Sequence, residues 1–490
     1  MLKITNSLTS AKEPFFSLTP GKVLLYVCGI TPYSQSHIGH GRCYTSFDVL
    51  YRLLKFLGND VRYCRNFTDV DDKLIYRALQ EFGRKDAYHA IADREIQQYH
   101  HEMKLLGNLS PDIEPRVTNN ISVIIEFIEQ LIAKGSAYPK DGSVYFRVAL
   151  APGYPQLARH KLDDLRAGER IDVREDKEDP LDFALWKNEP EGGFWDSPWG
   201  NGRPGWHIEC SALAGTYLGA HIDIHAGGMD LKFPHHDNEI AQSEAHYGAP
   251  FARYWVHNGL VRMGEEKMSK SLGNVFLLHN LFQEYDPMVI RFLFLMHHYG
   301  APLEFSQPVL DMARKTYERL CRMFENTSNT ISGVSGVSGI SGVNTPGISN
   351  NLHSNIPVIA SDIIRTSHDT ISVITSDMVR TSPVASKMLE FLCDDLNTVG
   401  MLGVLFDQIG SITSQEEKNI VKLFLQQMLG LTLEPIAAKT VEITPEIQSL
   451  LDEREQARIS KNWKRADEIR DQLQSMGVPI ADAKTAKPGK

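Results

Sequence analysis

The chain has 490 residues, of which 42% are hydrophobic and 23% are charged, and its net charge is −10. Its length predicts three or four domains, its composition is typical of a globular protein, and its acidic total does not by itself favour binding to nucleic acid. Six cysteines without a CxxC pair exclude a disulfide framework. The sequence has no apolar run of membrane-spanning length and no signal-peptide core at its start, so we expect a cytoplasmic protein without membrane association.

The first part of the chain predicts the opening of a parallel α/β sheet. Residues 23–27 form an apolar β-type run that ends in a turn at 28–32, and a helix is expected over 37–57. Another strand is predicted at 61–63, and helical patterns dominate from there to about residue 134. A strand, a glycine-containing turn and a helix in this order are typical of a parallel sheet with crossover helices.

The later part of the chain changes character several times. Short β runs with many Pro, Gly and Asp residues predict an insertion carried on the sheet, and amphipathic helices are expected further on. One apolar helical face is expected from Ala457 through Trp463 to Met476. The predicted regions are two halves of a sheet domain (1–135 and 206–257), an inserted subdomain between them (136–205), a linker domain (258–308), a helical bundle (309–440) and a short C-terminal helical region (441–490).

An unusual segment, residues 327–383, interrupts the predicted bundle. It opens with four tandem triplets, ISG-VSG-VSG-ISG, and later carries SDIIRTS and the near-copy SDMVRTS. Glycine at every third position suggests collagen, but the triplets contain no proline, which excludes that interpretation. Repeated Ser-, Gly- and Thr-rich sequence favours a flexible insertion that joins helices whose ends lie close together.

The first candidate site is the tetrapeptide His37-Ile38-Gly39-His40 at the start of the predicted helix. A helix N-terminus offers free N–H groups and a partial positive charge, which suit phosphate. Two imidazoles add hydrogen-bonding groups, and Gly39 allows a nucleotide to approach the backbone. Taken alone, however, the tetrapeptide fits surface histidines on a helix better than it fits a nucleotide site.

The second candidate site is Lys267-Met268-Ser269-Lys270-Ser271. Two lysines beside small hydroxyl residues suit a loop that places positive charge on a leaving pyrophosphate. Taken alone, this segment also fits a solvated run of charges. The combination of HIGH after the first strand and KMSKS some 230 residues later resembles the signature pair of class I aminoacyl-tRNA synthetases.

A third group of residues could hold a metal ion. Cys28, Cys210, His235 and Glu239 supply two thiols, an imidazole and a carboxylate, which together form a plausible zinc ligand set. A helix starting at Pro234 would place His235 and Glu239 on one face, four residues apart. The residues alone favour the plainer interpretation of two core thiols, a capping histidine and a surface glutamate.

The longer segments around these residues resemble one family. YVCGIT, HIGHGR, NFTDVDDK, PGWHIECSA, DIHAGGMDLKFPHHDNEIAQSE and HNGLVRMGEEKMSKSLGN are similar, in this order, to segments of cysteinyl-tRNA synthetases. The resemblance covers about residues 20–325 and 386–478. It implies a Rossmann-type parallel sheet with an inserted connective subdomain, followed by a C-terminal helical bundle.

The resemblance also implies roles for individual residues. One zinc ion per chain would be held by Cys28, Cys210, His235 and Glu239. The catalytic residues would be His37, His40, Lys267 and Lys270, and ATP would contact Ile30, His37, Gly39, His40 and Lys270. The substrate would contact Gly29, Thr68 and Trp206. The implied activity is ATP-dependent formation of cysteinyl adenylate, with Mg²⁺ accompanying ATP, and transfer of cysteine to the 3′ adenosine of tRNA(Cys). We expect the enzyme to be a monomer.

Zinc would explain how such an enzyme selects cysteine. Cysteine and serine differ by one atom, and shape alone gives only about 1–3 kcal/mol of discrimination. A thiol, with a pKa near ~8.5, readily becomes a thiolate on zinc, whereas an alcohol resists ionisation. The metal would therefore bind the substrate sulfur instead of activating water.

Several positions depart from the family pattern, and two rival functions stay open. Asp237 replaces a glutamate, Ala226 replaces a glycine, and DDLNTV stands where the family reads DDxNTP. The chain ends in VPIADAKTAKPGK without the family's usual final segment, which puts the anticodon contacts in doubt. The rivals are a cysteine ligase of mycothiol biosynthesis, which would transfer cysteine to an amino sugar, and an inactive homologue that acts as a binding module.

Overall fold

The computed structural model divides the chain into two compact units, residues 1–434 and 435–490. The described residues are 1–158, 177–189, 191, 194–263, 266–267, 276–325, 327, 374–436, 445–460 and 462–475. Among them, no helix combines the length and the apolar character needed to cross a lipid bilayer.

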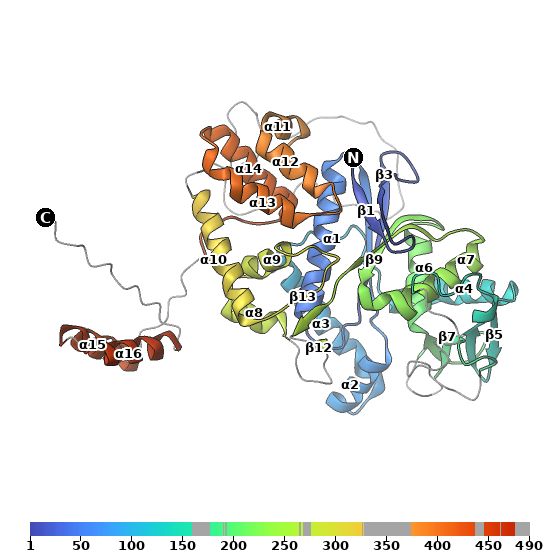
Figure 1. Cartoon of the computed structure of the whole chain (residues 1–490). Helices are drawn as coiled ribbons and strands as arrows, with labels where there is room; N and C mark the ends of the chain where they lie inside the picture. The colour runs from blue at the N-terminus through green and yellow to red at the C-terminus, as the bar shows by residue number, and fades with distance from the viewer. Residues whose placement is uncertain are drawn as a thin grey trace, which may run out of the picture. The chain divides into compact units, whose positions relative to one another are not determined.

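A four-stranded parallel sheet forms the centre of the first unit (Figure 1). Its strand order is β10-β9-β3-β4. The chain connects β3 to β4 through helix α1 and β9 to β10 through helix α7. The chain therefore leaves the adjacent strands β3 and β9 in opposite directions. At such a place α/β sheets bind ligands, beside the carboxyl ends of the strands. The bounds are β3 (Lys22–Ile30), α1 (Ile38–Phe56), β4 (Asp60–Phe67), β9 (Ile222–Gly228), α7 (Asp237–Tyr247) and β10 (Ala252–Asn258).

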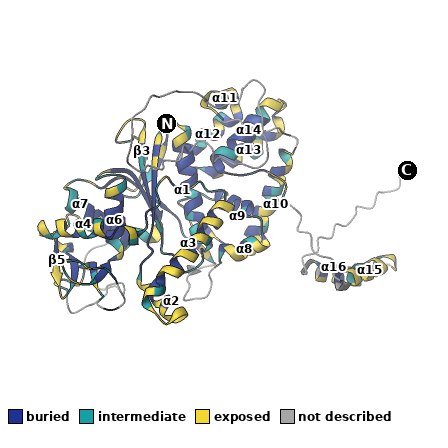
Figure 2. Cartoon of the chain, turned by 180° about the vertical axis from the view of Figure 1, so that it is seen from behind, coloured by how far each residue is buried: buried dark blue, intermediate teal, exposed yellow. Residues whose placement is uncertain are grey.

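The sheet is buried on both faces, as its apolar strands require. Val23, Leu25 and Val27 of β3 are fully buried, and Leu50 and Leu54 of α1 are buried with them. Figure 2 shows most of α1 in the dark blue of buried residues. The sequence prediction of a strand followed by a helix at this place is confirmed.

Strand β3 extends beyond its predicted end at residue 27. Its pairing with β4 shifts register between Val27 and Ile30, and Ile30 pairs with Phe67. The expected turn at 28–32 therefore begins too early. Gly29 suggested a turn, but it is needed for a close approach, because a Cβ atom there would lie 1.5 Å from the carbonyl oxygen of Asn66. Such irregularities redirect side chains.

A second, antiparallel sheet lies in the predicted insertion, in the order β5-β6-β7-β8. Ile128 of α4, Trp186 of β7 and Leu213 of α6 share one hydrophobic core, so the inserted sheet is packed on its neighbouring helices. The bounds are α2 (Asp72–Phe82), α3 (Tyr88–Leu105), α4 (Ile121–Ala133), β5 (Ala137–Lys140), β6 (Ser143–Phe146), β7 (Phe183–Asn188), β8 (Gly202–Pro204) and α6 (Trp206–Tyr217).

A small three-stranded sheet, in the order β12-β11-β13, follows the parallel sheet in the chain. Its bounds and those of its helices are β11 (Val261–Met263), β12 (Glu266–Lys267), α8 (Leu278–Glu284), α9 (Pro287–Leu295) and β13 (Leu303–Glu304). An N-terminal hairpin, β1 (Lys3–Asn6) and β2 (Ala11–Pro14), reaches the helical bundle, because Lys3 forms a bridge with Asp394.

The helical bundle comprises α10 (Gln307–Met323), α11 (Ser376–Thr381), α12 (Pro383–Leu392), α13 (Thr398–Gln408) and α14 (Gln415–Leu429). The predicted insertion at 327–383 ends earlier than expected, because its second RTS block forms α11. Thr375 caps that helix and Val379 is buried. Residues 328–373 lie outside the described part of the chain.

The second unit contains α15 (Pro445–Ile459) and α16 (Trp463–Ser475). Ile447, Ile469 and Leu473 form its small core. The expectation of a single apolar face through this region is wrong in two respects: the chain breaks between two helices, and the Trp463 side chain is 59% exposed.

Candidate functional site

Four predicted metal ligands converge where β3 and β9 end. Cys28 comes from the irregular end of β3, Cys210 from α6, His235 from the short π-helix Lys232–His236 before α7, and Glu239 from α7. Their ligand atoms all lie within 4.8 Å of one another, and all four residues are buried. The structure therefore brings together residues that are up to 211 positions apart in the sequence.

The distances fit a tetrahedral zinc ion. With Zn–S near 2.3 Å and Zn–O near 2.1 Å, a tetrahedral site has edges of about 3.8 Å between two sulfurs and about 3.6 Å between sulfur and oxygen. Cys28 Sγ lies 3.9 Å from Cys210 Sγ and 3.5 Å from Glu239 Oε1. His235 Nε2 lies 3.0 Å from the same Oε1. The donor set and its geometry thus fit a metal ion.

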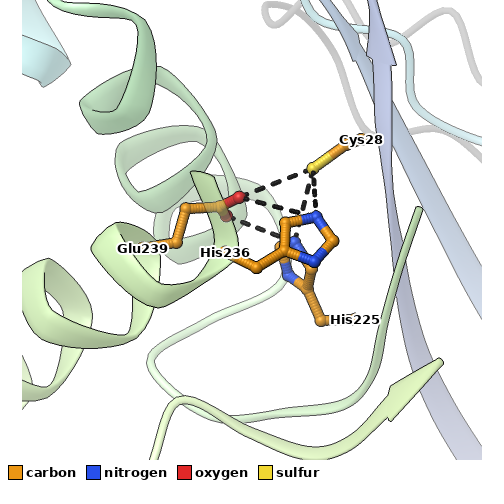
Figure 3. A group of neighbouring side chains, drawn as sticks. All are labelled: Cys28, His225, His236 and Glu239. Carbon is orange, nitrogen blue, oxygen red and sulfur yellow. Dashed lines mark hydrogen bonds and ion pairs between the residues drawn. The ribbon is translucent and has the colours of Figure 1, made fainter. Parts of the chain in front are cut away.

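A second set of possible ligands shares two residues with the first (Figure 3). His225 of β9 and His236 point their Nε2 atoms at Cys28 Sγ, at 3.5 and 3.3 Å. Sequence reasoning missed both histidines, although both stand in the quoted segment DIHAGGMDLKFPHHDNE. His236 is held by a hydrogen bond of 2.8 Å between its Nδ1 and His257 Nε2. Because the two sets share Cys28 and Glu239, they form a single buried cluster.

Burial and mutual contacts shift the pKa values in this cluster. Burial alone raises the pKa of Glu239, but His225 and His235 outweigh it and lower the pKa to about 2. Burial lowers the pKa of His235, but the Glu239 carboxylate outweighs it and raises the pKa to about 10. A hydrogen bond from the Cys28 thiol lowers the pKa of Cys210 to about 6, whereas burial raises the pKa of Cys28. Without a metal ion, one thiolate, one carboxylate and a protonated His235 are thus favoured here, and a metal cation would take the place of the His235 proton.

The predicted substrate residues surround this cluster. The Trp206 ring is 38% exposed and stacks on His235 with ring centres 4.3 Å apart. Thr68 donates a hydrogen bond of 2.6 Å to Glu209 Oε2, and the Gly29 N–H donates one of 2.9 Å to Asn66 Oδ1. The exposed indole beside buried polar groups offers one wall for a small molecule.

The HIGH residues lie at the N-terminus of α1. His37 is the N-cap: its Nδ1 accepts from the His40 N–H at 3.3 Å, and His40 Nδ1 accepts from the His37 N–H at 3.4 Å. The two rings stack with centres 3.7 Å apart. A Cβ atom at Gly39 would lie 2.9 Å from His37 Nδ1, so a side chain there would require the His37 ring to shift. Ile30, the last residue of β3, is buried.

The KMSKS residues are only partly described. The Lys267 backbone is in β12 and pairs with Arg262 of β11. Lys270 lies outside the described residues, so its predicted contact with ATP stays a prediction.

Comparisons with known proteins agree with this architecture. A family model described as "tRNA synthetases class I (C) catalytic domain" matches residues 14–315, and one described as "Cysteinyl-tRNA ligase anticodon binding domain" matches residues 440–487. The chain is 43% identical over 493 residues to the cysteine–tRNA ligase of Anoxybacillus flavithermus, covering 98% of this chain and 97% of that protein. It is 40% identical over 506 residues to that of Geobacter sulfurreducens, covering 98% of each.

A solved structure confirms the fold class. Methionyl-tRNA synthetase of Mycobacterium tuberculosis in complex with methionyl-adenylate superposes with a TM-score of 0.54 at 14% identity, covering 84% of this chain and 92% of that one. This likeness shows the fold alone, which is the predicted class I α/β architecture. Together with the family matches along nearly the whole sequence, it establishes that the chain belongs to the cysteine–tRNA ligases, a family of class I aminoacyl-tRNA synthetases.

Proposed function

We propose that the enzyme activates L-cysteine with ATP, transfers it to the 3′ adenosine of tRNA(Cys), and selects cysteine through a bound zinc ion. The observation that carries the proposal is the buried group of Cys28, Cys210, His235 and Glu239 at the carboxyl ends of β3 and β9. A cysteine–tRNA ligase needs a device that separates a thiol from an alcohol, and this group offers one at the position where the fold binds ligands.

Of the two overlapping ligand sets, the one with two sulfurs suits zinc better. Thiolates are preferred ligands of structural and substrate-binding zinc, and His236 already uses its Nδ1 for His257. Cys28, Cys210, His235 and Glu239 would hold the zinc, which would supply an additional ligand position for the substrate thiolate that the hydroxyl of serine could not fill equally well. His225 and His236 would then surround the ligands and orient Glu239.

The side chains of this enzyme hold the reactants in place for two displacement reactions. In the first, a carboxylate oxygen of cysteine bonds to the α-phosphorus of ATP and pyrophosphate leaves with the electron pair. In the second, a ribose hydroxyl of the tRNA loses its proton and bonds to the carbonyl carbon, and AMP leaves with the electron pair of the broken bond between that carbon and the phosphate oxygen. We assign His37, His40 and the α1 N-terminus to the phosphates, with Mg²⁺ on ATP, and Lys267 and Lys270 to the leaving pyrophosphate.

The remaining residues shape the amino-acid pocket. Trp206 covers His235 and would form the wall of the pocket against which the small substrate packs. Gly29 and Thr68 lie at the ends of β3 and β4, beside the metal-ligand group, and would face the backbone of the amino acid. Ile30 would contact the nucleotide.

The C-terminal unit would contact the anticodon end of the tRNA. Its match to an anticodon binding domain supports this role. Helix α16 exposes Trp463, and aromatic side chains of this kind stack on unpaired bases. We also propose that the enzyme acts as a monomer.

The test is a pair of assays on the purified enzyme. Cysteine-dependent ATP–pyrophosphate exchange and the charging of tRNA(Cys) should both occur. Exchange without charging of tRNA would indicate a ligase for another acceptor, such as an amino sugar. Absence of both reactions from a folded, zinc-loaded protein would indicate an inactive homologue and refute the proposal.

A further inference from the structure

Arg42 has no role in the proposed chemistry, yet its side chain makes many buried contacts. It lies on α1, two residues after His40, and its side chain is almost fully buried. Its two terminal nitrogens donate to five backbone carbonyls, in Gly259 (3.0 Å), Leu260 (2.9 Å), His298 (3.2 Å), Tyr299 (3.4 Å) and Ala301. Within the described part of the chain, Arg42 forms no ion pair with a carboxylate.

The five carbonyls belong to two segments that begin the small sheet. Residues 259–260 lead directly into β11, and residues 298–301 lead into β13. β11 pairs with β13 through Val261 and Leu303, and with β12 through Arg262 and Lys267. Arg42 therefore binds the residues that lead into β11 and β13. β11 in turn pairs with β12, the strand that carries Lys267.

Direct backbone hydrogen bonds also join the two segments, so removing the guanidinium should loosen their junction without severing it. Five carbonyl oxygens converge on one guanidinium, and their partial negative charges repel one another when that charge is removed. The backbones are already as close as they can be, because a Cβ atom on Gly259 would lie 2.2 Å from the Ala301 carbonyl oxygen. The Gly259 N–H also donates to the Tyr299 carbonyl at 2.8 Å. Arg42 thus stabilises a junction in which the two backbone segments are in close contact.

We propose that Arg42 is a positioning residue for amino-acid activation: it fixes the β11–β12 strand pair relative to the α1 N-terminus that carries His37 and His40. The proposal rests on the proposed function, in which Lys267 and Lys270 act on the phosphates of ATP opposite those histidines. Arg42 lies on the same helix as the HIGH residues and donates to the residues that lead into β11, the strand that pairs with β12. Catalysis by positioning is sensitive to displacements of about 1 Å.

Arg52 provides a matched control on the same helix. It is also a buried arginine that donates to carbonyls, those of Gly107 (2.8 Å) and Gln427 (3.1 Å), but these belong to other segments. Because Arg52 also forms a buried ion pair with Asp48, Arg52→Gln is the more disruptive substitution for α1 and makes a stringent control. Arg42→Gln and Arg52→Gln therefore both remove a buried guanidinium from α1, and only the first loosens the β11 and β13 junction.

The experiment compares Arg42→Gln, Arg42→Lys and Arg52→Gln with the unaltered enzyme. Arg42→Gln should lower the kcat of ATP–pyrophosphate exchange by at least about tenfold, while cysteine affinity in equilibrium dialysis stays within about twofold. Arg42→Lys should recover part of the rate, because an ammonium still carries the charge. Arg52→Gln should keep kcat within about twofold of the unaltered enzyme.

Hydrogen exchange separates this proposal from the function on which it rests. Peptides covering 259–263 and 298–305 should exchange faster in Arg42→Gln, and in Arg42→Lys if the first variant does not fold, but not in Arg52→Gln. This result is independent of catalysis, so it stands even if the unaltered enzyme shows no exchange reaction. Unchanged kcat in folded Arg42→Gln, an equal loss in Arg52→Gln, or a parallel loss of cysteine affinity would each overturn the proposal.

Discussion

A buried carboxylate, Asp48 of α1, links this helix through Arg291 to the helical bundle, and its removal should destabilise the first unit. Asp48 Oδ2 accepts from Arg52 Nε at 2.8 Å and from an Nη of Arg291, and Oδ1 accepts from the Leu109 N–H at 2.8 Å. Arg291 is fully buried and also donates to the Leu429 carbonyl at the end of α14. Asp48→Asn keeps the shape but leaves the amide NH₂ facing an N–H donor in either orientation.

The expected cost follows from breaking a buried ion pair. Removing one partner of such a pair costs about 3–5 kcal/mol, because the remaining charge stays buried without compensation. Burial raises the pKa of Asp48, but Arg52 and Arg291 outweigh it, so the pKa is lowered on folding. The stabilisation is therefore fully present above the unfolded pKa of about 3.9 and is lost as the pH falls through the lower folded pKa.

The measurement is urea unfolding of both proteins at pH 7 and at more acidic values. At pH 7, Asp48→Asn should lower the free energy of unfolding of the first unit by about 3–5 kcal/mol, and the difference should shrink below about pH 4. Asp86→Asn, which removes the exposed partner of Arg84, is the control and should cause no measurable change. A loss below about 1 kcal/mol at pH 7, or a difference that grows in acid, would refute the assigned role of Asp48.

Three further predictions concern the site and the insertion. Cys210→Ser should lose most of its bound zinc, measured by metal analysis, whereas His236→Ala should keep it; the reverse would favour the second ligand set. Lys270→Ala should slow pyrophosphate exchange by at least about 10²-fold and leave the affinity for cysteine nearly unchanged. An equal loss of cysteine affinity would contradict the role assigned to Lys270. A short Gly/Ser linker in place of 328–373 should preserve exchange and the melting temperature; a loss of exchange in a folded variant would contradict this. Extending the replacement to 383 should lower the melting temperature, because it removes α11.

The linker can be short because both ends of the omitted segment contact α14. Lys422 Nζ donates to the Thr327 carbonyl at 3.1 Å, and Gln427 Oε1 accepts from the Ile374 N–H at 3.1 Å. Five residues of helix correspond to a rise of about 8 Å. This geometry agrees with the sequence expectation that the helix ends on either side of the insertion lie close together.

The sequence predicted the central sheet and the four metal-ligand candidates for different reasons. The first strand and α1 follow from local apolar patterns. Cys28 and Glu239 are far apart in the sequence, and no spacing rule could join them, so their grouping depended on the resemblance to a family. His225 and His236 were missed because that resemblance assigned them no role. Their side chains are recognisable only once folding brings β9 beside β3.

The errors arose where composition concealed a local signal. The segment before α12 is rich in Ser and Thr, yet Thr375 is a helix cap, Val379 of α11 is buried, and Ile374 just before the cap is buried as well. In the C-terminal unit, Asn462 Oδ1 accepts from the Arg465 N–H at 3.3 Å, which marks a new helix start. An apolar periodicity that passes through such a cap does not distinguish one helix from two.

Selection of cysteine by the metal-ligand group is the central claim, and the most direct test compares cysteine with serine before and after metal removal. Pyrophosphate exchange by the zinc-loaded enzyme should favour cysteine by far more than the ~10–200-fold that shape alone provides. The metal-stripped enzyme should lose cysteine-dependent exchange and regain it when zinc is returned. A folded enzyme that contains no zinc and still activates cysteine with the same preference over serine would contradict the account.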